Sequence, residues 1–159
     1  MYGLGRDVNA IHRGARRGRA DVWGIDATAL AGDAPTMTTK DLDAFFEAGW
    51  NAHDVDRLMT FMADDCVFES VAGPDACGTR NVGRERVREA FARVFAAFPD
   101  ARFGAAQHFV SGDRGLSEWL FTGTASDGRK VEVNGCDVFT FREGKIALKS
   151  SFFKNRTAS

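Results

Sequence analysis

Apolar residues recur at the spacing of an α-helix in three segments between residues 38 and 98. The first segment has them at positions i, i+3, i+4, i+7 and i+8, occupied by Leu42, Phe45, Phe46, Gly49 and Trp50. This spacing places apolar side chains on one face of a helix. The same pattern predicts a second helix over 55–62 and a third over 87–98, which ends before Pro99.

Shorter apolar runs between turn-forming residues predict a sheet. Residues 66–70, CVFES, predict one short strand, and the turn-rich residues 71–83 predict a loop. Four further strands are predicted over 101–110, 116–124, 130–141 and 145–153. Asp127-Gly128 and Glu143-Gly144 suit tight hairpin turns. This order indicates an α+β fold in which helices pack on one face of an antiparallel meander.

Composition and charge narrow the class of protein. The chain has 159 residues, of which 44% are hydrophobic and 27% charged, as is typical of one globular domain with a single core. The net charge of −1 gives no reason to expect a nucleic acid or an anionic membrane as a partner. No apolar run approaches the roughly 18 residues of a membrane span. We therefore expect a soluble protein with no nucleic-acid partner and no membrane partner.

The cysteines and histidines give no sign of a disulfide framework or a metal site. Cys66, Cys77 and Cys136 are odd in number and widely spaced, which favours a reducing cytoplasm. None of the three histidines has a Cys, His or acidic partner at a metal-binding spacing. The sequence therefore predicts a cytoplasmic protein with no cofactor and no metal.

Residues 1–36 differ from the rest of the chain. They are rich in Arg and Gly, show no sustained hydrophobic period and lack the apolar core of an export signal. Their composition predicts a disordered extension. One domain is then expected over residues 37–159.

Three stretches together resemble one known family. They are WNAHDVDRLMTFMADDCVFE, GRERVREAFARVFAAFPD and DGRKVEVNGCDVFTFREGKI. The chain is similar, over residues 40–154, to the SnoaL-like and ketosteroid-isomerase-like branch of the nuclear transport factor 2-like superfamily. The resemblance implies a cone-shaped α+β barrel with cystatin-like topology. In it, a strongly curved antiparallel sheet wraps around three N-terminal helices and leaves a pocket between them.

Asp137 is an acid on an aromatic strand face, which it shares with Phe139 and Phe141. By the resemblance it stands where ketosteroid isomerases place the acid of their oxyanion hole. The alternative is a structural acid bonded to backbone at a bend made by Gly135. The other expected groups are replaced, because the tyrosine position holds Phe46 and the general-base position holds Ser70. An isomerase with the usual residues is therefore not expected.

Three residues compete for the role of general base beside Asp137. If Glu118, Leu120 and Thr122 share the concave face with Asp137, then Trp119 and Phe121 face outward. Lys149 and Phe153 join that concave face from the last strand. Glu118, Lys149 and His108 are the candidate bases. The alternatives are a structural ion pair for Glu118 and Lys149, and an ordinary half-buried strand residue for His108.

The expected ligand is a small apolar molecule. The residues predicted to bind it are Phe46, Trp50, Glu69, Ser70, Phe91, Phe95, Leu120, Thr122, Phe139 and Phe153. The helical aromatic residues among them are equally typical of a core. The predicted function is cofactor-free acid–base catalysis (isomerisation, cyclisation or dehydration beside a carbonyl group). The alternative is a noncatalytic ligand-binding or dimerisation module of the same fold.

A homodimer is predicted through the convex face of the sheet. With the strand faces assigned as above, Trp119, Phe121, Leu148 and Phe152 form an outward-facing apolar stripe. An exposed stripe of this size needs a cover. A second subunit is the cover that the resemblance implies.

Overall fold

A computed structural model describes residues 35–156 of the chain. The helices are α1 (Thr39–Ala44), η1 (Phe45–Trp50), α2 (Val55–Phe61) and α3 (Arg84–Ala97). The strands are β1 (Met62–Glu69), β2 (Arg80–Val82), β3 (Arg102–Ser111), β4 (Arg114–Thr124), β5 (Lys130–Arg142) and β6 (Lys145–Phe153). The predicted extension over residues 1–36 lies almost wholly outside the described residues.

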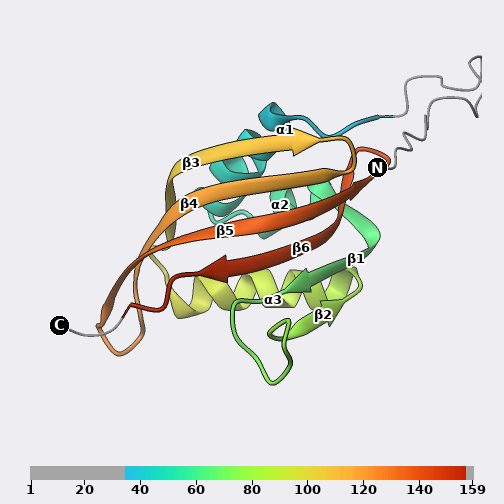
Figure 1. Ribbon diagram of the computed structural model, residues 1–159. Helices are drawn as coiled ribbons and strands as arrows, with labels where there is room; N and C mark the ends of the chain where they lie inside the picture. Colours follow the sequence, from blue (N-terminus) through green and yellow to red (C-terminus); the bar gives the residue numbers. More distant parts are fainter. Residues whose placement is uncertain (1–34, 157–159) are drawn as a thin grey trace, which may run out of the picture. The chain divides into compact units, whose positions relative to one another are not determined.

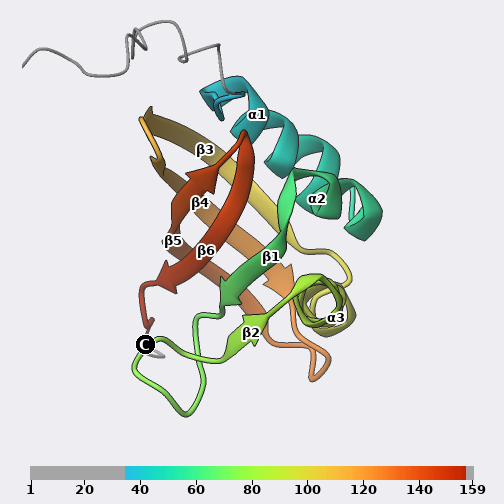
Figure 2. The ribbon, with the colours of Figure 1, turned by 90° about the vertical axis from the view of Figure 1, so that its right-hand side faces the viewer.

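The strands form one curved sheet in the order β2-β1-β6-β5-β4-β3, which does not close into a barrel (Figure 1). The helices lie together on one side of it (Figure 2). The predicted α+β class is confirmed, and so is the antiparallel meander from β3 to β6. The expectation of a wholly antiparallel sheet was wrong, because β1 pairs in parallel with β6. The segment predicted as a loop also contains β2, a short strand that extends the sheet beyond β1.

The first predicted helix is continuous but changes its winding halfway. Thr38 and Asp41 form a capping box at its start. From Phe45 to Trp50 the helix is a π-helix, and the amide of Asn51 donates to the carbonyl oxygen of Phe46. The wider turns leave four residues of this segment buried: Phe45, Phe46, Gly49 and Trp50.

Aromatic rings join the helical layer to the sheet. Phe45 of η1 meets Phe139 of β5 at 6.2 Å between ring centroids, and Trp50 meets Phe91 of α3 at 4.9 Å. Phe91 in turn meets Phe68 of β1 at 5.1 Å. The interplanar angles of these pairs are 87°, 66° and 60°, edge-to-face arrangements that aromatic rings favour. The core between helices and sheet is therefore largely aromatic.

A bulge sets which side chains of β6 face the helices. Phe141 pairs with Ile146, but Thr140 pairs with Leu148, so Ala147 is an extra residue on β6. Because of this extra residue, Ile146 and Lys149 are both buried. A regular alternation from Lys149 along β6 would place Ile146 on the outer face with Leu148, so the bulge accounts for its burial.

The predicted orientation of β4 was also wrong. Asp137 lies opposite Ser117 and not opposite Glu118. Directly opposed residues share a face of the sheet. Trp119 and Phe121 therefore point inward, where they are buried, and Glu118, Leu120 and Thr122 point outward.

Candidate functional site

A buried cluster of polar side chains lies on the inner face of β5 and β6. Lys149 Nζ donates to Asp137 Oδ1 and to Ser151 Oγ, each at 2.7 Å. Ser151 donates its hydroxyl proton to the same Oδ1. Asp137 lies opposite Ser151 in the strand pairing, and Lys149 is two residues from Ser151 on the same face. Asp137 is fully buried and Lys149 is 2% exposed, so the ion pair is shielded from water.

Trp119 completes the shell of Asp137. Its indole Nε1 donates to Asp137 Oδ2 at 3.1 Å. Gly135, opposite Trp119 on β5, makes room for the indole, because a Cβ there would lie 2.3 Å from the ring. Asp137 is thus bound by three side-chain donors. The sequence alternative of an acid bonded to backbone at Gly135 is not what the hydrogen bonds show.

The environment of Lys149 acts on its pKa in two opposing ways. Burial disfavours the charged form and lowers the pKa of Lys149 below its usual value, while the nearby Asp137 carboxylate partly restores it. The ammonium also lies over the rings of Trp50 and Phe68, at 5.2 and 4.9 Å from their centroids. Desolvation is the largest effect, so the pKa of Lys149 is lowered.

Lys149 and Ser151 line a small apolar cavity between the sheet and α3. The cavity has a volume of about 140 Å³. Its wall is formed by Trp50, Phe68, Ser70, Val71, Val94, Phe98, Phe103, Trp119, Phe121, Lys149, Ser151 and Phe153. Val71 and Phe153 are partly exposed, so the cavity reaches the surface beside them. An apolar cavity of about 150 Å³ is large enough for a benzene-sized molecule.

Asp137 lies behind this wall and does not line the cavity. The expectation that Asp137 itself faces the ligand was therefore wrong, because Lys149 and Ser151 occupy the intervening positions. Trp50, which does line the cavity, has a buried indole Nε1 that finds no hydrogen-bond partner among residues 35–156. A buried donor without a partner is costly, and a ligand oxygen could satisfy it.

His108 belongs to a separate hydrogen-bonded chain. Its Nδ1 lies 2.7 Å from Ser117 Oγ and its Nε2 lies 3.2 Å from Asp43 Oδ1. The ring packs against that of Phe46 with 5.2 Å between centroids and an angle of 30° between the planes. A serine, a histidine and an aspartate in sequence resemble a nucleophilic triad, but Ser117 is fully buried and lines none of the cavities. The structure does not bring His108 to the cavity wall.

The burial of His108 predicts a dependence of stability on pH. Burial lowers the pKa of His108, and Asp43 and Asp137 only partly offset this. The unfolded chain therefore binds this proton at a higher pH than the folded chain does. As a result, the free energy of unfolding falls as the pH is lowered from the usual His pKa of about 6.5 to the pKa of His108 in the folded protein. We expect His108→Gln to flatten this part of the curve of unfolding free energy against pH, measured with urea. An unchanged slope would contradict the assignment.

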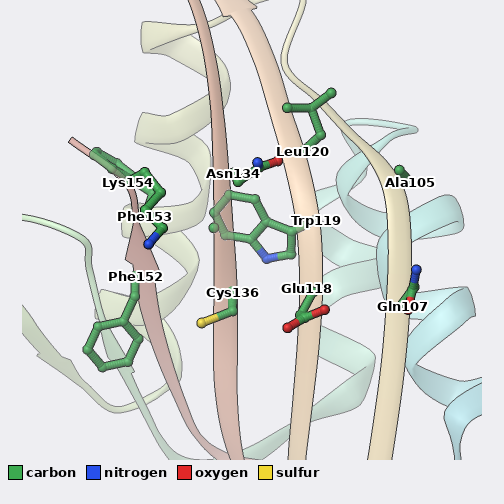
Figure 3. Close-up of a pocket in the computed structure, with 11 residues that line it drawn as sticks. Ala105, Gln107, Glu118, Trp119, Leu120, Asn134, Cys136, Phe152, Phe153 and Lys154 are labelled. Carbon is green, nitrogen blue, oxygen red and sulfur yellow. The ribbon is translucent and has the colours of Figure 1, made fainter. Parts of the chain in front are cut away.

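Glu118 and Leu120 are on the outer face of the sheet, in a surface hollow of about 600 Å³ shown in Figure 3. Cys136 and Phe152 line the same hollow. Thr122 also points outward. Glu118, Leu120 and Thr122 therefore cannot face a ligand in the inner cavity. Their predicted placement was wrong because β4 turns its other face, with Trp119 and Phe121, toward the helices.

The remaining predicted binding residues divide into three groups. Trp50, Ser70 and Phe153 line the cavity. Glu69 is paired with Arg80 on the neighbouring β2. The others pack in or against the aromatic core away from the cavity wall: Phe46, Phe91, Phe95 and Phe139.

Sequence analysis missed several residues of the wall. The inward position of Trp119 and Phe121 was indicated by their own alternation with Glu118 and Leu120. Ser151 lies midway between Lys149 and Phe153, which were predicted on the concave face, but it had no predicted role. Val94 and Phe98 belong to a regular helical stripe, and nothing in such a stripe separates a cavity wall from a core.

The described residues contain neither a membrane-spanning helix nor a cluster of metal-binding side chains. No helix within residues 35–156 is long and apolar enough to cross a membrane. The same part of the chain contains no group of three or more His, Cys, Asp or Glu side chains arranged to hold a metal ion.

Comparison with known proteins gives a family and a set of similar folds. Residues 42–149 match the SnoaL-like domain family. No curated protein matches the sequence. Among solved structures, a candidate polyketide cyclase from Xanthomonas campestris pv. campestris is 20% identical, with a TM-score of 0.64 over 73% of this chain and 89% of that one. A candidate polyketide cyclase from Pseudomonas putida KT2440 is 18% identical, with a TM-score of 0.65 over 74% and 92%. TerC, crystallised with polyporic acid, is 19% identical, with a TM-score of 0.61 over 73% and 90%.

Proposed function

Because the chain belongs to the SnoaL-like domain family, we propose that its inner cavity binds a small, apolar, carbonyl-containing molecule and carries out acid–base chemistry on it. The observation that supports this most is the position of Lys149, a buried cation on the wall of an otherwise apolar cavity. A buried charge is costly and tends to mark a functional site. The similar structures include candidate polyketide cyclases, whose substrates would carry carbonyl groups.

The hydrogen bonds divide the roles between Lys149 and Asp137. An ammonium has three N–H donors, and two of those on Lys149 are used by Asp137 and Ser151. The third is available to a carbonyl oxygen in the cavity. When Lys149 is neutral it accepts a proton from the ligand, and Asp137 holds or releases the compensating proton behind it. Asp137 thus acts through Lys149 and Ser151, and Lys149 contacts the ligand.

Binding of cyclohexanone, compared with methylenecyclohexane, tests this proposal. The two molecules have nearly the same shape, but only the ketone has an oxygen that Lys149 can bind. Since a hydrogen bond to a charged donor contributes about 1.5–3 kcal/mol, we expect calorimetry to show at least a tenfold preference for the ketone. Val94→Phe, which places a ring in the cavity, should abolish binding of both molecules.

Val82→Phe is the matched control, since Val82 is exposed on β2 and does not line the cavity. It should bind the ketone as the wild type does. Equal affinity of the wild type for ketone and hydrocarbon would contradict a polar role for Lys149. Unchanged ketone binding by Val94→Phe would place the ligand elsewhere.

A noncatalytic binding module is the second candidate. One observation favours it: three side chains bind Asp137 and none of its surface reaches the cavity. Such a protein would bind cyclohexanone without accelerating any exchange of the ligand's protons. The exchange measurement described in the Discussion separates the two candidates.

We also propose that the chain forms a homodimer through the outer face of its sheet. Phe109, Leu116 and Val138 lie side by side across β3, β4 and β5 on that face. Phe109 is 53% exposed and Phe152 on β6 is 54% exposed. Large apolar side chains exposed on one sheet face are typical of an interface. Trp119 and Phe121 do not take part, since they are buried in the core.

Light scattering after gel filtration is expected to give the mass of a dimer at micromolar concentration. Phe152→Glu should shift the mass to that of a monomer, because the carboxylate would be buried without a partner at the interface. Ala96→Glu is the control, since Ala96 is exposed on α3, in the helical layer on the other side of the sheet. A monomeric wild type, or dissociation by both variants, would contradict the proposed interface.

A cytoplasmic location is proposed with the same function. Cys66, Cys77 and Cys136 are all free thiols, which suits a reducing environment.

A further inference from the structure

Lys149 differs from every other lysine within residues 35–156, because it alone is buried. Its amino group lies at the wall of the apolar cavity, within 2.7 Å of both a carboxylate and a hydroxyl. An amine in such a place is a nucleophile as well as a hydrogen-bond donor. The question is whether the cluster around it can complete a covalent reaction with a carbonyl carbon.

We propose that Lys149 forms an imine with a small apolar aldehyde or ketone bound in the cavity, with Asp137 as the acid and base of the reaction and Ser151 as the proton relay between Asp137 and the carbonyl oxygen. This inference rests on the proposed function, since it requires a carbonyl compound in the same cavity. It adds a covalent intermediate to acid–base chemistry.

The first step prepares the nucleophile. A proton moves from Lys149 Nζ to Asp137 Oδ1 along their 2.7 Å hydrogen bond, which gives a neutral amine and a neutral acid. A dry surrounding favours this transfer, because two buried charges become none. The lowered pKa of Lys149 is consistent with a readily available amine. The neutral amine then has a lone pair to offer to the cavity.

The remaining steps balance without an oxidant or a cofactor. The lone pair of Nζ forms a bond to the carbonyl carbon, and the carbonyl oxygen takes the proton of Asp137 through the Ser151 hydroxyl. The nitrogen then returns one proton to Asp137. That proton leaves with the oxygen as water, while a C=N bond forms. One amine, one carboxylic acid and one carbonyl compound thus give a protonated imine, a carboxylate and one water molecule.

The cluster suits this product as well as it suits the free lysine. A protonated imine carries the same charge as the ammonium, so its pairing with Asp137 is retained. The rings of Trp50 and Phe68 lie over the nitrogen and also favour a cation there. The unpartnered Nε1 of Trp50, on the same cavity wall, can donate to the carbonyl oxygen and polarise it before attack.

Reductive trapping tests the inference on the wild-type chain. The folded protein is incubated with cyclohexanone and sodium cyanoborohydride, which reduces a protonated imine to a stable secondary amine much faster than it reduces the ketone, and peptides are mapped by mass spectrometry. We expect the adduct on Lys149 to form at least tenfold faster than on Lys130, which is exposed at the start of β5. The preference should disappear in urea and in Val94→Phe, while Val82→Phe should retain it.

Calorimetry with cyclohexanone on the same samples separates the two levels of the proposal. Binding together with an adduct on Lys149 supports both. Binding with an adduct spread evenly over the exposed lysines overturns the imine and leaves the proposed function standing. No binding and no selective adduct overturns both. The doubly substituted Asp137→Asn/Lys149→Met chain has no charge at either position and no lysine on the cavity wall, so an adduct still trapped at the cavity of that variant would also overturn the inference.

Discussion

Replacing Asp137 with alanine is expected to lower the free energy of unfolding by about 3–5 kcal/mol near neutral pH. The substitution removes the carboxylate on which Lys149, Ser151 and Trp119 converge. It leaves the Lys149 ammonium buried without a counter-charge, and this penalty is the main part of the expected loss. Urea unfolding followed by tryptophan fluorescence measures the change.

This deficit should shrink as the pH is raised. Burial lowers the pKa of Lys149, and Asp137 is the group that raises it back. Without Asp137 the pKa of Lys149 in the folded protein falls further. The unfolded chain then binds more protons than the folded chain over a wider pH range below the usual Lys pKa of about 10.5. Stability of the variant therefore rises with pH through that range. A deficit that is constant from neutral pH to about pH 10 would contradict the assignment.

The doubly substituted Asp137→Asn/Lys149→Met chain is the matched control. Both replacements keep the approximate shape and neither carries a charge, so no buried ion is left alone. Buried ion pairs often contribute little beyond their own desolvation cost. We expect the double variant to lie within about 1.5 kcal/mol of the wild type. A double variant as unstable as Asp137→Ala would mean that the unpaired charge of Lys149 does not account for the loss.

The second large effect is expected in proton exchange on a bound ketone. The wild type should accelerate the exchange of the α-protons of cyclohexanone in D₂O, because Lys149 can polarise the oxygen and accept a proton in one cavity. Proton transfer by a positioned side chain contributes about 10²–10⁴-fold, so the double variant should be at least a hundredfold slower. Proton NMR of the α-position measures the rate.

Val94→Phe and Val82→Phe control this experiment as they control binding. The first should exchange no faster than buffer, and the second should match the wild type. If the wild type binds the ketone but exchanges its protons no faster than the double variant, the noncatalytic module is the better account.

The fold was largely predictable from periodicity. The capping box at Thr38, the helical stripe that ends before Pro99 and the Glu143-Gly144 turn are local signals, and each lies where the structure has an element boundary. Both turn residues have positive φ, as a two-residue hairpin requires. The parallel pairing of β1 with β6 was not predictable in the same way, because it joins segments about eighty residues apart and no local pattern records the direction of pairing.

The site was predictable in part. Alternation placed Asp137 with Phe139 and Phe141 on one face, and the structure has all of them buried on that face. The inward position of Lys149 was predicted correctly, because Lys149 and Asp137 lie on the same side of the bulge at Ala147 and the alternation between their strands is unbroken there. The predicted orientation of β4 was wrong because it placed Glu118 on the face of Asp137, which requires Trp119 to point outward. Here the hydrophobic alternation was the better guide.

The division of the cluster into a wall and a second layer could not be predicted. Asp137, Lys149 and Ser151 all occupy inward positions, and sequence gives no measure of how far each side chain reaches. The long lysine side chain and the small serine border the cavity, while the short aspartate is covered by them and by Trp119. This detail makes Lys149 the proposed ligand contact.

The most direct test observes the amino group of Lys149 itself. In ¹⁵N-labelled protein the buried and hydrogen-bonded ammonium should give a slowly exchanging Nζ signal, which is assigned by its absence in the Asp137→Asn/Lys149→Met chain. Titration with cyclohexanone should shift or deplete this signal in a saturable way, with the Kd found by calorimetry, and methylenecyclohexane should shift it far less. A Lys149 signal that is unchanged at saturating cyclohexanone would contradict the account.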